Sequence, residues 1–154
     1  MNILLTMGMG LLVVVSGVPA ASTARPTGVF APARAQNNWM LHCQGCHLAS
    51  GDTQTRNAPP LAGQVSRVLA VAGGREYLAR VPGVATTPLP DDQLAELLNW
   101  TLARFDPQHL PPDYRPYTAQ EIHRLRQLPL RTEAGSVRAS LQAKLSGRNK
   151  HQQK

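Results

Sequence analysis

The sequence of 154 residues is poor in aromatic side chains, which make up 5% of it, and it contains only two cysteines. Glycine and proline are abundant by comparison, with 12 and 13 residues. A single domain of this length with so few large apolar side chains has a thin protein core. We therefore expect a bound apolar group to supply part of the buried surface.

Both cysteines lie in one motif, Cys43-Gln44-Gly45-Cys46-His47, and the sequence has neither a second CxxC nor an HxxxH motif. This absence argues against zinc, which usually needs a second pair of ligands. No βαβ pattern surrounds the motif, as a thioredoxin-like dithiol would require. A disulfide between Cys43 and Cys46 would close too short a loop to stabilise the fold much. A metal site, a redox dithiol and structural cysteines remain minor alternatives.

The spacing of this motif is typical of covalent haem c attachment. Two thiols on one short helical turn can each bond a vinyl group at one edge of a porphyrin. The next residue then lies beneath the ring, where the Nε2 atom of an imidazole can bind the iron as the proximal ligand. We predict that Cys43 and Cys46 bind the haem and that His47 ligates its iron.

No charged side chain precedes Arg25, and the N-terminus contains the apolar run Leu11-Leu12-Val13-Val14-Val15. We expect a signal peptide over residues 1–20 and a linker over residues 21–36. A signal peptide usually has Lys or Arg before its apolar run, and none occurs here. An uncleaved membrane anchor is therefore the alternative. Either interpretation places the domain outside the cytoplasm.

The formal net charge of +7 is unevenly distributed. Residues 36–114 contain five Arg against seven Asp or Glu, hence −2, whereas residues 115–154 contain nine Lys or Arg against two Glu, hence +7. We interpret the basic end as a solvated, partly disordered tail, with docking to an acidic partner or a membrane surface as the alternative. Nucleic acid is not an expected partner, because no aromatic residues are interleaved with these charges.

Apolar periodicity predicts an all-α chain. The strongest helix pattern covers Asp91 to Phe105, and its apolar stripe is predicted to be core. Weaker patterns predict a short helix capped by Asn37 or Asn38 that enters Cys43, a helical segment from Val65 to Ala72, a short helix over 75–80, and an irregular proline-rich loop over 81–90. Beyond a proline-rich connector over 107–117, Thr118 and Glu121 predict a capping box and a helix that ends before Pro129. A further helix containing Val137, Leu141 and Leu145 is expected, with residues 146–154 frayed.

Between the motif and the middle of the chain stands Pro59-Pro60-Leu61. Prolines have no backbone N–H, so the carbonyls of this loop are free to accept hydrogen bonds. One of them is well placed to accept the Nδ1–H of His47, which would fix the tautomer of the ring. A simple turn is the alternative.

Over residues 37–106 this layout resembles the class I monohaem cytochrome c family. The matching features are the short helix entering CxxCH, the Pro59-Pro60-Leu61 loop, a middle helix, a distal loop, and a Leu-rich last helix with an aromatic residue, Trp100. The resemblance implies an all-α, cytochrome c-like helical domain around one covalently bound haem, with residues 118–154 as a C-terminal helical extension. It also implies a periplasmic location, a Pro59 carbonyl that orients His47, and first and last helices that cross.

The sequence departs from this family at the sixth iron ligand. The family usually supplies a methionine from the distal loop, but methionine occurs here only at positions 1, 7, 9 and 40. Met40 lies one turn before Cys43 and is poorly placed to reach the far face of the haem. We predict an open or water-bound sixth position, with His109 as the next candidate, followed by His42 and His123, and with Met40 or a partner's side chain as the remaining alternatives.

The resemblance implies a carrier of single electrons rather than an enzyme, with no catalytic residue. Its expected partners are redox proteins, such as a periplasmic dehydrogenase and an oxidase, and it would contact a membrane only if the leader is uncleaved. Two alternatives stay open. One is a haem protein whose open iron binds or reacts with a small ligand, and the other is a haem subunit of a larger complex that docks through its C-terminal helices.

Overall fold

The computed structural model describes residues 27–55 and 58–152, and the expected signal peptide lies outside them. Every regular element in these ranges is helical, as the sequence predicts. The elements in chain order are α1 (Pro32–His42), the 3₁₀ helix η1 (Arg67–Ala70), α2 (Gly74–Arg80), α3 (Pro82–Ala85), α4 (Asp91–Phe105), the 3₁₀ helix η2 (Pro107–His109), α5 (Ala119–Arg126) and α6 (Ala134–Gln152).

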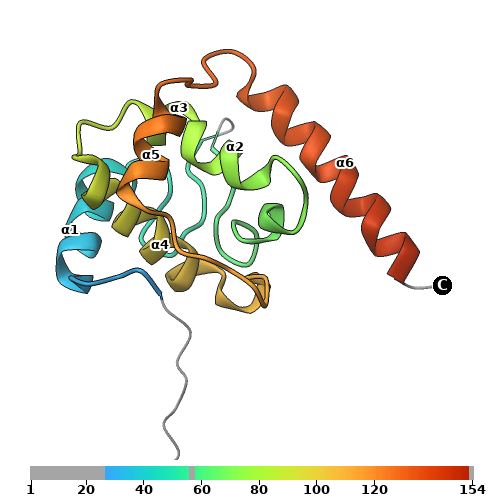
Figure 1. Ribbon diagram of the computed structural model, residues 1–154, viewed down its shortest axis with the longest axis horizontal. Helices are drawn as coiled ribbons and strands as arrows, with labels where there is room; N and C mark the ends of the chain where they lie inside the picture. The colour runs from blue at the N-terminus through green and yellow to red at the C-terminus, as the bar shows by residue number, and fades with distance from the viewer. Residues whose placement is uncertain (1–26, 56–57, 153–154) are drawn as a thin grey trace, which may run out of the picture.

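Helix α4 is the centre of the fold, with α1 and α5 packed against it (Figure 1). Its bounds agree with the sequence prediction, and its apolar stripe is buried from Leu94 to Phe105. Asp91 and Asp92 occupy its first turn, where negative charge is favourable at the positive end of the helix dipole. The contact between α1 and α4 is the packing expected between the first and last helices of the haem domain.

Helix α1 begins at Pro32, whereas the sequence predicted a start capped by Asn37 or Asn38. Proline is favourable in the first turn of a helix, because its missing N–H would have no partner there. The N-cap residue, Ala31, has no side chain that could cap, and the Glu96 carboxylate of α4 accepts its N–H instead. Residues 32–36 of the expected linker are therefore helical, because their cap comes from a distant part of the chain.

Two segments in the middle of the chain also differ from the prediction. The helical pattern from Val65 to Ala72 forms only the short helix η1. Its N-cap, Ser66, donates its N–H to the buried carboxylate of Asp106 at 2.8 Å and not to a preceding turn, and the helix ends before Val71, whose backbone is extended. The proline-rich loop over 81–90, predicted to be irregular, contains α3. Pro82 stands in the first turn of this helix, where its fixed φ favours a helical start.

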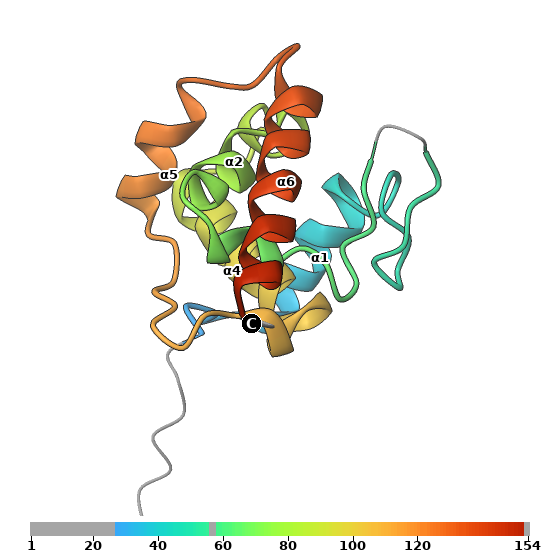
Figure 2. The same cartoon turned by 90° about the vertical axis from the view of Figure 1, so that its right-hand side faces the viewer.

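The C-terminal extension is helical as far as Gln152, so the expected fraying is wrong up to that residue, and residues 153–154 lie outside the described part of the chain. The hydroxyl of Thr118 accepts the N–H of Glu121 at 3.2 Å, which confirms one half of the predicted capping box, whereas the Glu121 carboxylate accepts from Arg75. Helix α6 continues to Gln152 and lies along α2 and η1, at the far end of the molecule from α1 (Figures 1 and 2). Leu141 is buried in a second apolar cluster with Tyr77 and Leu130, so the prediction of a partly disordered tail is wrong over these residues. No helix in the described part of the chain is long and apolar enough to cross a membrane.

Candidate functional site

The CxxCH motif forms a single tight turn that continues α1. Cys43 caps the helix, and its N–H donates to the carbonyl of Trp39 at 2.9 Å. The carbonyl of Cys43 in turn accepts the N–H of Cys46 at 3.1 Å and that of His47 at 2.9 Å. Both thiols and the imidazole therefore belong to one turn, as their spacing predicted.

Both cysteines are free thiols, Cys43 half-buried and Cys46 exposed. Burial, and to a lesser extent the neighbouring Cys46, raises the pKa of Cys43 to about 11. A redox-active dithiol depends on a lowered thiol pKa, so this setting argues against thioredoxin-like chemistry. Within residues 27–55 and 58–150, no three His, Cys, Asp or Glu side chains come together in a way that could hold a metal ion. The side chains alone therefore give no zinc site in this part of the chain.

The imidazole of His47 is half-buried, and burial lowers its pKa. The backbone of Pro59 acts on the ring as a hydrogen-bond acceptor and opposes this shift, although Nδ1 has no partner at full hydrogen-bonding geometry. Pro59 thus lies beside the ring, and a Pro59 carbonyl that orients His47 stays a prediction. A neutral imidazole is the form of histidine that binds a metal through a ring nitrogen.

A cluster of aromatic side chains packs against this turn. The ring of Trp39 lies 6.1 Å from that of His47, 5.9 Å from Trp100 and 4.6 Å from Phe105, between ring centroids. The loop after the motif packs onto the same group, because Gly51, at φ +82°, lies against the Phe105 ring. An aromatic cluster carried by α1 and α4 thus packs against the imidazole of His47.

Partly buried apolar side chains from several elements pack on the same core as Cys43. Among them are Leu61 of the proline loop, Leu69 of η1, Leu78 of α2, Val84 of α3 and Leu89 before α4. This distribution is expected around an apolar ligand that completes the core. Sequence reasoning gave no role to Leu78 or Leu89, although a leucine between Pro88 and Pro90 is unusual in an exposed loop and could have been noticed.

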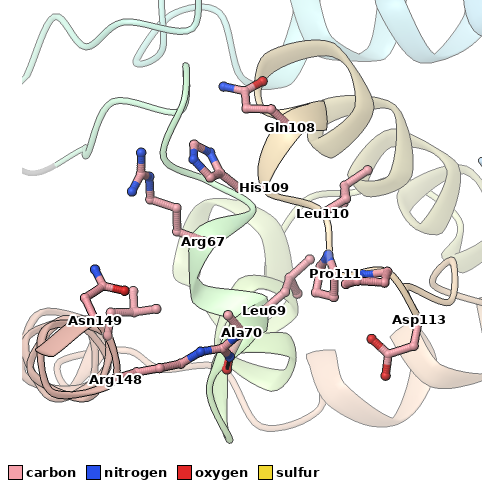
Figure 3. A pocket seen from close by; sticks show the side chains of 12 residues that line it. Arg67, Leu69, Ala70, Gln108, His109, Leu110, Pro111, Asp113, Arg148 and Asn149 are labelled. Atoms are coloured by element: carbon pink, nitrogen blue, oxygen red, sulfur yellow. Dashed lines mark hydrogen bonds between the residues drawn. The ribbon is translucent and has the colours of Figure 1, made fainter. Parts of the chain in front are cut away.

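His109 lies in a cavity that the CxxCH turn does not line. Its Nδ1 contacts the carboxylate of Asp106 at 2.5 Å, and it lines a cavity of about 500 Å³ together with residues of η1 and α6, among them Arg67 and Arg148 (Figure 3). Neither cysteine nor His47 lines this cavity. The structure brings Cys43, Cys46, His47 and Pro59 together, and a role for His109 as sixth ligand stays a prediction.

The other candidate sixth ligands have exposed side chains, and a role for any of them stays a prediction. His42 is exposed at the end of α1, and 49% of Met40 is exposed. His123 contacts the Asp91 carboxylate through Nδ1 at 2.9 Å on the outside of α5.

Two curated relatives match this chain over 102 residues at 32% identity, and both are named cytochrome c-552, one from Thermus thermophilus and one from a particular strain of the same species. The match covers 54% of this chain, 78% of the first relative and 69% of the second. No protein-family model matches the chain. No solved structure matches it either.

Proposed function

The chain belongs to the monohaem c-type cytochromes, and we propose that it is an exported carrier of single electrons that holds one haem c at Cys43 and Cys46. The observation that carries this proposal is the turn at the end of α1. It presents both thiols and His47 together, with the His47 N–H bonded to the Cys43 carbonyl at 2.9 Å. No other cysteine occurs in the sequence, so Cys43 and Cys46 are the only residues to which a haem could be attached through thioether bonds.

The surrounding residues fit a haem. The Nδ1 atom of His47 is buried without a full hydrogen bond beside the Pro59 backbone, which is where a proximal histidine needs an acceptor. The apolar side chains that border the core would cover the faces of a flat ring and exclude water from it. When bound, the haem supplies an iron that alternates between ferric and ferrous states. The chain contributes attachment by Cys43 and Cys46, ligation by His47 and orientation by Pro59.

A second candidate function is the binding of a small molecule at an open sixth position. It is favoured by the absence of methionine after residue 40, because the loop expected to face that position has no thioether. A site without a strong sixth ligand binds carbon monoxide or nitric oxide when the iron is ferrous.

The partners we propose are periplasmic redox proteins, one that donates and one that accepts an electron. The exposed thiol of Cys46 marks the edge at which the haem would meet them, since the Cys43 side is half-buried. Cell fractionation of the full chain tests the location. We expect the protein in the periplasm, or in the membrane if the leader is uncleaved, and recovery in the cytoplasm alone would contradict export.

The test of the haem is an optical spectrum of the full chain, expressed together with a cytochrome maturation system. We expect a c-type spectrum that survives acid and organic extraction, and its loss in a Cys43→Ser, Cys46→Ser double variant. Absence of the spectrum under conditions that mature a control cytochrome would contradict the proposal. Addition of carbon monoxide to the ferrous protein then separates the two functions: no spectral change supports a closed electron carrier, and rapid binding supports the open site.

A further inference from the structure

One side chain of the C-terminal extension is bonded to the loop between α3 and α4. The guanidinium of Arg126, on α5, donates to the carbonyl of Ala85 at 3.2 Å and to that of Leu89 at 2.8 Å. It also donates to the carbonyl of Thr87, and it pairs with the Asp91 carboxylate at 2.8 Å. Only 16% of the Arg126 side chain is exposed.

Thr86 and Thr87 bond the first part of this loop back to α3, since their N–H and hydroxyl groups donate to carbonyls of residues 82–84. Pro88 and Pro90 have no N–H to donate, and carbonyls at alternate positions turn to Arg126. A planar guanidinium carries several N–H donors in a fixed fork, so one arginine can satisfy several carbonyls at once. A lysine amine is a point charge on a flexible stem and cannot reproduce this pattern.

The element that carries Arg126 is firmly attached to the domain. Helix α5 packs on α4 and α3 (Figure 1), and its Ile122 is completely buried in the main core. His123, on the same helix, contacts the Asp91 carboxylate at 2.9 Å. The loop is therefore fastened to a helix outside the segment, 37–106, that resembles a cytochrome c.

The fastened loop packs on the same hydrophobic core as the CxxCH turn. Leu89 of the loop and Val84 of α3 contact this core, as Cys43 and Leu61 do. Residues 81–90 contain no Met, His, Cys or Lys, so no iron bond can hold this segment in place. The bonds to Arg126 are thus the polar contacts that tie this segment to the C-terminal extension, in addition to the bonds of Thr86 and Thr87 to α3.

We propose that Arg126 is a positioning residue that holds the 85–91 loop against the haem site and limits the entry of small ligands to the iron. This inference rests on the proposed function, because it concerns access to the same haem. It assigns the C-terminal extension a role in the chemistry of the site: α5 sets how open the sixth position is.

The test compares Arg126→Gln with Arg124→Gln, in the haem-loaded full chain. Arg124 is exposed on the same helix, so both variants lose the same charge. We expect hydrogen exchange of the amides in residues 83–91 to rise about tenfold or more in R126Q, since charge-assisted hydrogen bonds are lost, and carbon monoxide to bind the ferrous protein several-fold faster. R124Q should match the wild type in both measurements. Arg126→Lys keeps the charge without the fork and should change both in the same direction, by less; it takes the place of R126Q if that variant does not fold.

The outcomes distinguish a failure of the proposed haem function from a failure of the proposed role of Arg126. A wild-type protein without a c-type spectrum contradicts the proposed function. A haem-loaded R126Q that exchanges and binds carbon monoxide like R124Q contradicts the role of Arg126 and leaves the haem in place. Faster exchange with an unchanged carbon monoxide rate overturns the control of ligand entry.

Discussion

The carboxylate of Glu96 accepts the backbone N–H of Ala31 at 2.6 Å, across 65 residues of sequence. The same oxygen accepts the N–H of Phe30 at 2.8 Å, and the other oxygen pairs with Arg34 at 2.8 Å. Glu96 is only 3% exposed. The first turn of α1 is thus capped from α4, and the helix that presents Cys43 is held by α4 at both its cap and its buried face.

Glu96→Ala should destabilise the protein by about 1–3 kcal/mol, because it removes the cap and leaves the guanidinium of Arg34 without its partner. The free energy of unfolding in urea measures this loss. Glu76→Ala is the matched control, since Glu76 is an exposed glutamate in the first turn of α2. It should cost less than about 1 kcal/mol. Equal losses in the two variants would contradict the capping role.

The Glu96 carboxylate should also make the stability of the first turn of α1 depend on pH. Burial alone would raise the pKa of Glu96, but the N–H groups of Ala31 and Phe30 and the guanidinium of Arg34 outweigh it and lower the pKa below 4.5. A lowered pKa in the folded state means that the stabilisation is present above the unfolded-state value and is lost as the pH falls through the folded-state pKa. Hydrogen exchange of the Ala31 amide, corrected for its intrinsic rate, should accelerate below pH 4.5. Glu96→Gln should abolish this acid step, and its persistence would assign the step to another group.

Gly51→Ala should destabilise the fold by about 1–3 kcal/mol. Gly51 has φ +82°, and a Cβ there would lie 2.5 Å from the Phe105 ring. Gly135→Ala is the control, because nothing lies within 4 Å of a Cβ at that position. It should be neutral or stabilise α6 by up to about 1 kcal/mol. Thermal midpoints of the two variants check the difference, and a fall for both would show that steric contact at Phe105 is not the cause.

Asn99→Ala should cost about 2–4 kcal/mol, because each buried polar group left unpaired costs about 1–3 kcal/mol. Its Oδ1 accepts the N–H of Tyr117 at 2.8 Å and the hydroxyl of Tyr114 at 2.7 Å, and its Nδ2 donates to the carbonyl of Tyr117 at 3.0 Å. Tyr114→Phe removes one of these bonds and should cost less. Urea unfolding of both variants checks the order, which would be reversed if Asn99 were replaceable by a buried water.

Leu141→Ala should loosen α6 without affecting the haem site. Leu141 is 2% exposed, and truncation of a buried leucine costs about 2–5 kcal/mol. Its cluster with Tyr77 and Leu130 shares no buried residue with the main core, although the partly buried Leu78 packs on both. We expect faster hydrogen exchange in α6, unchanged exchange in α4 and an unchanged haem spectrum. Leu128→Ala is the control, since Leu128 is 65% exposed. Loss of protection in α4 would mean that α6 supports the whole domain.

The sequence by itself determined the features whose causes lie within a turn or two of the residues concerned. The spacing of Cys43, Cys46 and His47 predicted that they share one turn, the apolar stripe from Leu94 to Phe105 predicted α4, and Thr118 with Glu121 predicted the start of α5. Each depends on helical periodicity or on a local hydrogen bond, and both can be read from neighbouring positions.

Only the tertiary structure decided where α1 begins, where the middle helical pattern begins, and whether the basic C-terminus is ordered. In each case the deciding partner is distant in sequence: Glu96 caps α1, Asp106 takes the N–H of Ser66, and Tyr77 with Leu130 buries Leu141. Arg126 and its loop belong to the same class, with partners 35 to 41 residues away. A local pattern cannot show which buried acceptor or apolar surface a segment will meet, because that depends on how the whole chain packs around α4.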